Sequence, residues 1–125
     1  MSSLKTLLVL LLVLPMPSPA ADDPLVSSFA ACAGRFSAEL EHAWLMNDDR
    51  TDQIAHRRAQ FIDLLNATVP DDQRRHALHL RVDAKVAHAQ LLTAASFSRD
   101  ADRSQWAVRR AKSEIDYCTG FLLES

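Results

Sequence analysis

The chain of 125 residues contains little glycine, cysteine or aromatic residue, with only two Gly, two Cys and 6% Phe, Trp and Tyr. It lacks a glycine-rich phosphate loop, a serine nucleophile elbow and the His-Glu-x-x-His zinc motif. It also lacks alternating runs of Val, Ile and Thr and the Asn-Gly or Asp-Gly turns of β-hairpins. These absences argue against the common enzyme classes and favour an all-α, non-enzymatic protein.

Neither sign of charge dominates, because 14 Lys and Arg are balanced by 16 Asp and Glu, for a net charge of −2. Nucleic acids and anionic membrane surfaces attract clustered positive charge, so we expect neither as a partner. The basic pairs are interleaved with acidic residues, which is typical of a solvated helix surface. These pairs are Arg57-Arg58, Arg74-Arg75 and Arg109-Arg110.

The longest apolar run, residues 7–14, is too short to anchor the chain in a membrane. About 10 helical residues span about 15 Å, roughly half of a hydrocarbon core. The run follows Lys5 and precedes a proline-rich stretch that ends in small residues, the order found in secretory signal peptides. We expect a signal peptide over residues 1–20 and, after cleavage, a single periplasmic or secreted helical domain over residues 21–125.

Apolar residues recur at spacings of three and four in four segments, which predicts four helices. The breaks fall at residues 47–52, at Val69-Pro70 and at 97–104. Asp23 and Pro24 predict the start of the first helix, and Asp71 and Asp72 are expected to cap the third. Four helices with short connections favour an antiparallel up-down-up-down four-helix bundle. The predicted core stripes are Phe29, Cys32, Phe36, Leu40, Ala43 and Trp44; Ile54, Phe61, Ile62 and Leu65; Leu80, Ala84, Ala87, Leu91 and Ala94; and Trp106, Val108, Ala111, Ile115, Cys118 and Leu122.

The two cysteines, Cys32 and Cys118, fall on the predicted apolar faces of the first and last helices. If these helices are antiparallel neighbours, the cysteines lie about 12 Å and about 8 Å from the same end of the bundle. Similar heights, an even count and export to an oxidising compartment predict a disulfide, with two buried thiols as the alternative. A lipidated cysteine would follow the apolar run within a few residues, and Cys32 does not.

The candidate metal ligands are Glu39 and the histidines His42, His56 and His88. Glu39 and His42 form one Glu-x-x-His pair, but a di-iron bundle needs two such pairs and two further glutamates. His42, His56 and His88 would lie at similar heights, yet none falls on the main apolar stripe of its helix. We therefore expect surface or boundary histidines and no metal or other cofactor. A metal, haem or small-ligand carrier is the alternative.

Trp44 and Trp106 are predicted near the same end of the bundle. Tryptophan at helical spacing is usually part of the core, which is the interpretation that we favour for both. Alternatively, with Leu45 and Met46, they form an apolar patch or pocket that binds a partner or ligand. The sequence thus predicts a non-enzymatic exported protein that binds another macromolecule or supports the cell envelope.

The predicted size, export signal and helix number are superficially similar to periplasmic bundles of the cytochrome c-prime and cytochrome b562 types. The first type attaches haem through Cys-x-x-Cys-His, but no such motif follows Cys118. The second needs a Met early in the first helix and a His late in the fourth. Here Met46 ends the first helix and the fourth has no His, so the sequence is assigned to neither.

Overall fold

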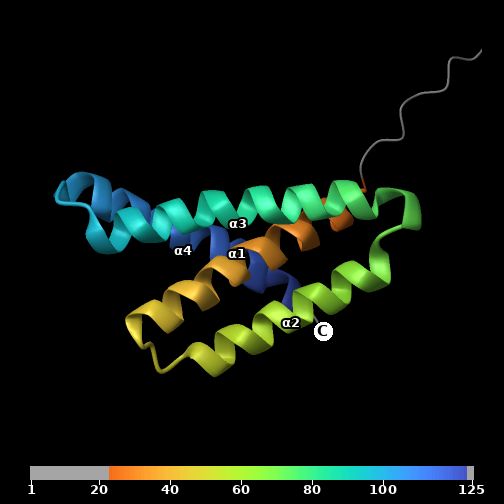
Figure 1. Cartoon of the computed structure of the whole chain (residues 1–125), viewed down its shortest axis with the longest axis horizontal. Coiled ribbons are helices and arrows are strands. Elements are labelled where there is room, and N and C mark those ends of the chain that lie inside the picture. Colours follow the sequence, from red (N-terminus) through yellow and green to blue (C-terminus); the bar gives the residue numbers. More distant parts are fainter. Residues whose placement is uncertain (1–22, 124–125) are drawn as a thin grey trace, which may run out of the picture.

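A computed structural model describes residues 23–123, and this range is almost entirely helical (Figure 1). The described residues contain no strand, so the predicted all-α class is confirmed. The predicted signal peptide lies outside the described residues. Within those residues, no helix has an apolar stretch long enough to cross a bilayer. The helices are α1 (Pro24–Met46), α2 (Thr51–Thr68), the short 3-10 helix η1 (Asp71–Gln73), α3 (Arg74–Phe97) and α4 (Ala101–Leu123).

Local sequence signals set most of the helix ends. The side chain of Asp23 accepts a hydrogen bond of 2.9 Å from the backbone N–H of Leu25, which caps α1 as predicted. α2 ends at Thr68, because the next residue precedes Pro70 and is extended. The predicted start of the third helix is wrong in detail. Asp71 lies in η1, α3 begins at Arg74, and no side chain caps either element.

α1 is the central helix, since it packs against each of the other three helices. Within the described residues, the backbone of α2 comes close to no helix except α1, whereas α3 also packs against α4. Figure 1 shows α1 between α3 and α2, with α4 behind it. The four helices therefore form a helical bundle. The bundle is not a closed ring, because α2 and α3 are not packed as neighbours in the described part of the chain.

Gly34 allows the closest approach between α1 and α3. A Cβ atom at this position would lie 2.1 Å from the carbonyl oxygen of Arg81 and 2.9 Å from the backbone nitrogen of Lys85. Neither backbone atom can move aside as a flexible side chain would, so only glycine fits. The buried small residues Ala30 and Ala38, one helical turn before and after Gly34, are part of the same tightly packed helix.

Aromatic residues fill the core where α1 begins and α2 ends. Phe61 is fully buried, and its ring stacks on Phe36 with centroids 5.6 Å apart. Phe29 contacts Phe61 and meets the edge of Phe121 at 5.5 Å. We call this region the closed end.

Several predicted core residues are exposed in the structure. Trp44, Trp106 and Val108 are 63%, 54% and 52% exposed, and Ala87 also faces solvent. For Trp44 the reason is geometric, because Figure 1 shows the end of α1 diverging from the end of α3. On α3 the predicted stripe is rotated from the true one, whose buried members are Ala77, His88 and Leu92.

Candidate functional site

A disulfide joins Cys32 of α1 to Cys118 of α4, as predicted. Both cysteines are completely buried, and their Cα atoms are 5.6 Å apart. The bond connects residues 86 positions apart, so it closes most of the described chain into one loop. With both sulfur atoms bonded and out of contact with solvent, the pair is structural rather than reactive.

Charged side chains reinforce the contact between α1 and α4 beside the disulfide. Arg35 Nη2 lies 2.7 Å from Glu114 Oε2, and Arg110 Nη2 lies 2.8 Å from the other oxygen of the same carboxylate. The Arg35 guanidinium also lies over the ring of Tyr117, 5.9 Å from its centroid. Each of these groups is engaged within the fold, so this cluster is a structural network and not an open site.

Of the four candidate metal ligands, the structure brings only Glu39 and His88 together within the described residues. His42 Nε2 lies 3.0 Å from Ser96 Oγ, whereas His56 faces solvent on α2. Among residues 23–123, no group of three His, Cys, Asp or Glu side chains is placed to hold a metal ion. The histidines therefore give no basis for a metal centre in this part of the chain.

His88 corrects the expectation that all three histidines lie at the surface or boundary. It is only 2% exposed, and its Nε2 lies 2.8 Å from Oε1 of Glu39. Its Nδ1 is buried without a hydrogen-bond partner among the described groups. The sequence places His88 off the stripe predicted for α3, but the true contact face of α3 includes it because α1 and α3 cross so closely.

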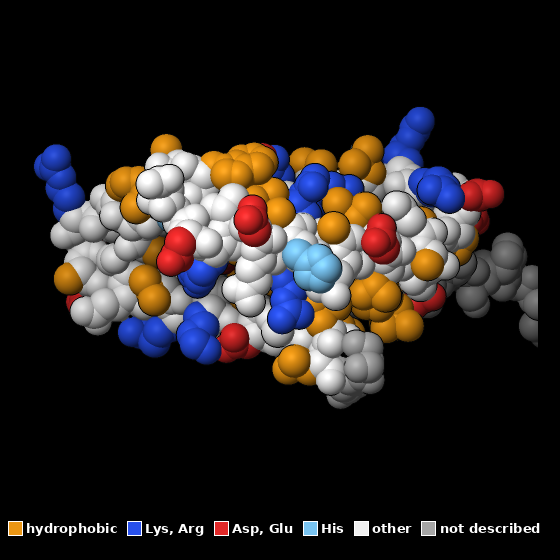
Figure 2. Space-filling view, turned by 90° about the horizontal axis from the view of Figure 1, so that it is seen from below, with side chains coloured by type: hydrophobic (Ala, Val, Ile, Leu, Met, Phe, Trp, Pro, Cys, Tyr) orange, Lys and Arg blue, Asp and Glu red, His pale blue; other side chains and the backbone are white. Residues whose placement is uncertain are grey.

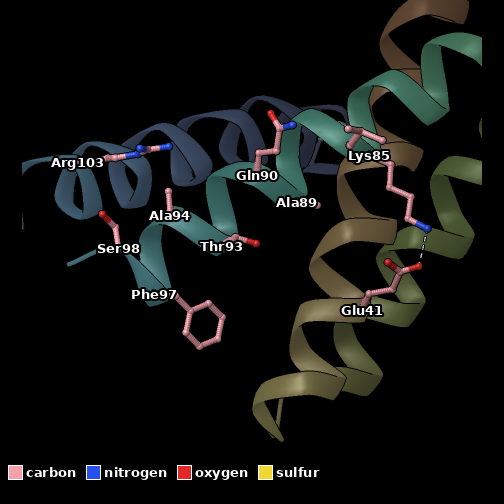
Figure 3. Close-up of a pocket in the computed structure, with 10 residues that line it drawn as sticks. Glu41, Lys85, Ala89, Gln90, Thr93, Ala94, Phe97, Ser98 and Arg103 are labelled. Atoms are coloured by element: carbon pink, nitrogen blue, oxygen red, sulfur yellow. Dashed lines mark hydrogen bonds and ion pairs between the residues drawn. The ribbon is translucent and has the colours of Figure 1, made fainter. Parts of the chain in front are cut away.

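An open cleft lies where α1 and α3 diverge, with a volume of about 920 Å³. Figure 3 shows the ion pair of Lys85 with Glu41, 2.5 Å apart, where the two helices are close. Further along α3, Phe97 points away from its helix toward open space (Figure 3). Ala94 and Arg103 add an apolar and a charged group to the lining, so the cleft is chemically mixed.

Exposed apolar side chains gather at the end of α1. Trp44, Leu45 and Met46 are consecutive, and all three are at least half exposed. Phe97, also more than half exposed, lies at the other side of the divergence, with its ring 6.4 Å from that of His42. We call Trp44, Leu45, Met46 and Phe97 the apolar end surface. Trp106 is 54% exposed, contrary to the favoured core assignment, and no contact between described residues joins it to Trp44.

The loop after α1 is held by local polar contacts. Asn47 ends α1 in the left-handed conformation, with φ of 53°. Arg50 donates hydrogen bonds from Nε to Oδ1 of Asp48 at 3.1 Å and from Nη2 to Oδ2 at 2.7 Å. Hydrogen bonding to Arg50 lowers the pKa of the Asp48 carboxyl from 3.8 to about 2. The apolar end surface is therefore followed by an ordered turn.

The face of the molecule that carries α2 is chemically mixed. Figure 2 shows Lys and Arg side chains interspersed with acidic and apolar ones, and no broad patch of one charge appears on this face. This agrees with the scattered charges of the sequence. The exposed apolar end surface and the open cleft therefore remain the more distinctive features.

Comparison with known proteins assigns no family. No family model matches the chain, and neither does any curated protein or solved structure. The function must therefore be inferred from the side chains themselves. The sequence pointed to Trp44, Leu45 and Met46 but missed Phe97 and the open cleft. The one available signal was that Phe97 is a large apolar residue at the start of a predicted break.

Proposed function

We propose that this chain is an exported, non-enzymatic helical protein that binds a partner protein through its apolar end surface and the adjoining open cleft. The exposure of Trp44, Leu45 and Met46, three consecutive large apolar residues, carries the proposal. Isolated exposed apolar residues are common, but clustered tryptophan, phenylalanine and methionine are enriched in protein interfaces. Contact with a partner would remove this surface from water.

The shape of the cleft suits a macromolecule better than an enclosed small ligand. Its apolar lining, Val86, Ala89, Ala94 and Phe97, follows one side of α3. Apolar residues spaced along a helix beside an open groove can receive the apolar face of a partner helix. The ion pair of Lys85 and Glu41 limits how deeply a partner could enter.

The proposed location is an oxidising compartment outside the cytoplasm. The apolar run at residues 7–14 supports export, and the buried disulfide is compatible with such a compartment. The proposal includes removal of residues 1–20 and an alternating up-down direction of the four helices, which the short connections support. The mature protein would have no membrane anchor.

Site-specific photo-crosslinking in the native host tests the proposal. A photoreactive residue replaces Leu45 in the apolar end surface or, as a control, the exposed Asn66 at the opposite end of α2. We expect one defined protein adduct from position 45 and none from position 66. Trp44→Ala should reduce the adduct in a protein that keeps its helical circular dichroism spectrum. Equal adducts at both positions, or none at position 45, would contradict the proposed interface.

Two further measurements on the protein purified from its native compartment test the proposed cleavage of the signal peptide and the alternative function as a carrier. Amino-terminal sequencing should begin at Ala21 if the signal peptide is removed as proposed. A visible spectrum and elemental analysis should show no stoichiometric chromophore or metal. A bound haem or metal would instead favour the carrier function.

A further inference from the structure

A recess between α2 and α3 lies beside the close crossing at Gly34. α1 lies against the backbone of α3 there, whereas α2 packs on α1 and, in the described chain, its backbone does not come close to that of α3. The space left between α2 and α3 has a volume of about 400 Å³. Its floor is formed by α1, including Ser37 and Leu40. Ligand sites commonly have volumes of about 300 to 1,000 Å³, so the recess can hold a small molecule.

Positive charge is concentrated in this recess. Arg58 of α2 and Arg81 and Lys85 of α3 line it, and Glu41 is its only acidic lining residue. Lys85 and Glu41 form an ion pair and neutralise each other. Two guanidinium groups then remain without a carboxylate partner among the described residues, in a chain whose net charge is −2. This local excess of positive charge favours an anion.

The two arginines differ in how they are held. Arg58 Nε donates a 2.9 Å hydrogen bond to Oγ of the buried Ser37, which itself donates to the carbonyl oxygen of Ala33 at 2.8 Å. This anchor leaves both terminal amino groups of Arg58 without a described partner. Arg81 makes no hydrogen bond or ion pair through its side chain within the described residues, and burial, followed by the charge of Arg58, lowers its guanidinium pKa. A bound anion would relieve this repulsion.

The remaining wall of the recess is apolar. Leu40 is buried in the floor, whereas Trp44, Leu78 and Val82 are each about half exposed or more. An inorganic anion would pair with the guanidinium groups but leave this wall in water. A carboxylate attached to a short apolar group would satisfy the charges and also cover the wall, which adds a hydrophobic contribution to binding.

We propose that this cationic recess binds a small amphipathic carboxylate. The carboxylate lies between Arg58 and Arg81, because the planar guanidinium fork matches two carboxylate oxygens. The aliphatic or aromatic group lies against Trp44 and the adjacent apolar wall. Trp44 belongs to both this recess and the apolar end surface, and Glu41 and Lys85 line both cavities. Arg58 and Arg81 line the recess but not the open cleft, so substituting them tests carboxylate binding separately from partner binding.

Calorimetric titration with octanoate tests the proposal on the full, disulfide-bonded protein. We expect saturable binding at one site, with the dissociation constant raised at least about tenfold in Arg81→Gln, as loss of a charge-assisted hydrogen bond implies. Arg109→Gln, which removes an exposed arginine on α4, should leave it unchanged. Octan-1-ol should bind at least about tenfold more weakly because it has no charge. Absence of octanoate binding, or equal binding by Arg81→Gln, would overturn the proposal.

Two further measurements separate the charge from the apolar contact. Inorganic phosphate should bind more weakly than octanoate, and equal or tighter binding would show that the apolar wall plays no part, contrary to the proposal. In the wild-type protein, octanoate should shift the NMR signal of the Trp44 indole N–H but not that of Trp106. This measurement uses only the wild-type protein, so it does not depend on the folding of a variant. A shift of the Trp106 signal without a shift of the Trp44 signal would place the ligand elsewhere and contradict the proposed site.

Discussion

At the closed end aromatic side chains are buried against one another, whereas at the opposite end, which carries the apolar end surface and which we call the open end, they face solvent. Phe29, Phe36 and Phe61 pack within the contact of α1 and α2, close to the disulfide. Trp44 and Phe97, at the other end of the molecule, are more than half exposed. The same class of residue at the same helical spacing thus has two different roles. Burial depends on whether the neighbouring helices converge, and exposure at the open end leaves surface for binding.

Removing the disulfide should have the largest effect on stability. In the chain-entropy model, a link across 86 residues stabilises a protein by about 4 to 5 kcal/mol. We therefore expect the paired variant Cys32→Ser and Cys118→Ser to lose about that much free energy of unfolding, as measured by urea denaturation. If the paired variant were as stable as wild type, the disulfide would not explain the integrity of the closed end.

A matched pair of aromatic substitutions measures the difference between the two ends directly. Phe36→Ala at the closed end should cost about 3 to 5 kcal/mol, because it leaves a cavity beside the stacked ring of Phe61. Trp44→Ala at the open end should change stability by less than about 0.5 kcal/mol, because its indole is mostly exposed. Similar losses for both variants in thermal unfolding would show that Trp44 belongs to the core after all.

Glycine substitutions test the close crossing of α1 and α3. Gly34→Ala should destabilise the protein by about 3 kcal/mol, the upper range for overpacking, because the new Cβ meets the backbone of Arg81. Gly120→Ala is the matched control, since a Cβ there has no atom within 4 Å. It should stabilise α4 by about 1 kcal/mol through helix propensity. The crossing is misplaced if both variants unfold at the wild-type urea concentration.

The pH dependence of the loop at the open end should be the smallest effect. The folded pKa of Asp48 is about 2, below its ordinary value of 3.8, so between these values the unfolded state binds more protons. The contribution of Asp48 to stability is therefore fully present above pH 3.8 and lost as the pH falls through about 2. An NMR titration should show the Asp48 pKa rising toward 3.8 in Arg50→Gln, and an unchanged value would refute the role of Arg50.

The sequence could predict features that depend on local chemistry. The cap at Asp23, the end of α2 before Pro70, and the pairing of Cys32 with Cys118 all follow from residue type, spacing and helix length. The cap and the helix end depend on residues within one or two helical turns. The disulfide prediction compares how far each cysteine lies from the same end of the bundle, which needs no crossing angle.

Features that depend on how the helices cross could not be predicted. The exposure of Trp44 follows from the divergence of α1 and α3, and the burial of His88 follows from the close approach that Gly34 permits. Periodicity identifies an apolar face but gives no crossing angle. The cationic recess has the same origin. Arg58 and Arg81 are 23 positions apart and look like surface residues until α2 and α3 are placed on either side of it.

The attachment of α2 to a single neighbour has a consequence for how the protein moves. α1, α3 and α4 pack against one another and a disulfide joins α1 to α4, whereas among residues 23–123 the backbone of α2 packs on α1 alone. Local unfolding follows the weakest set of contacts, so α2 is the segment whose amide protons should exchange with solvent first. Such an excursion would uncover Phe61 and separate Arg58 from Arg81 while the other three helices stay assembled.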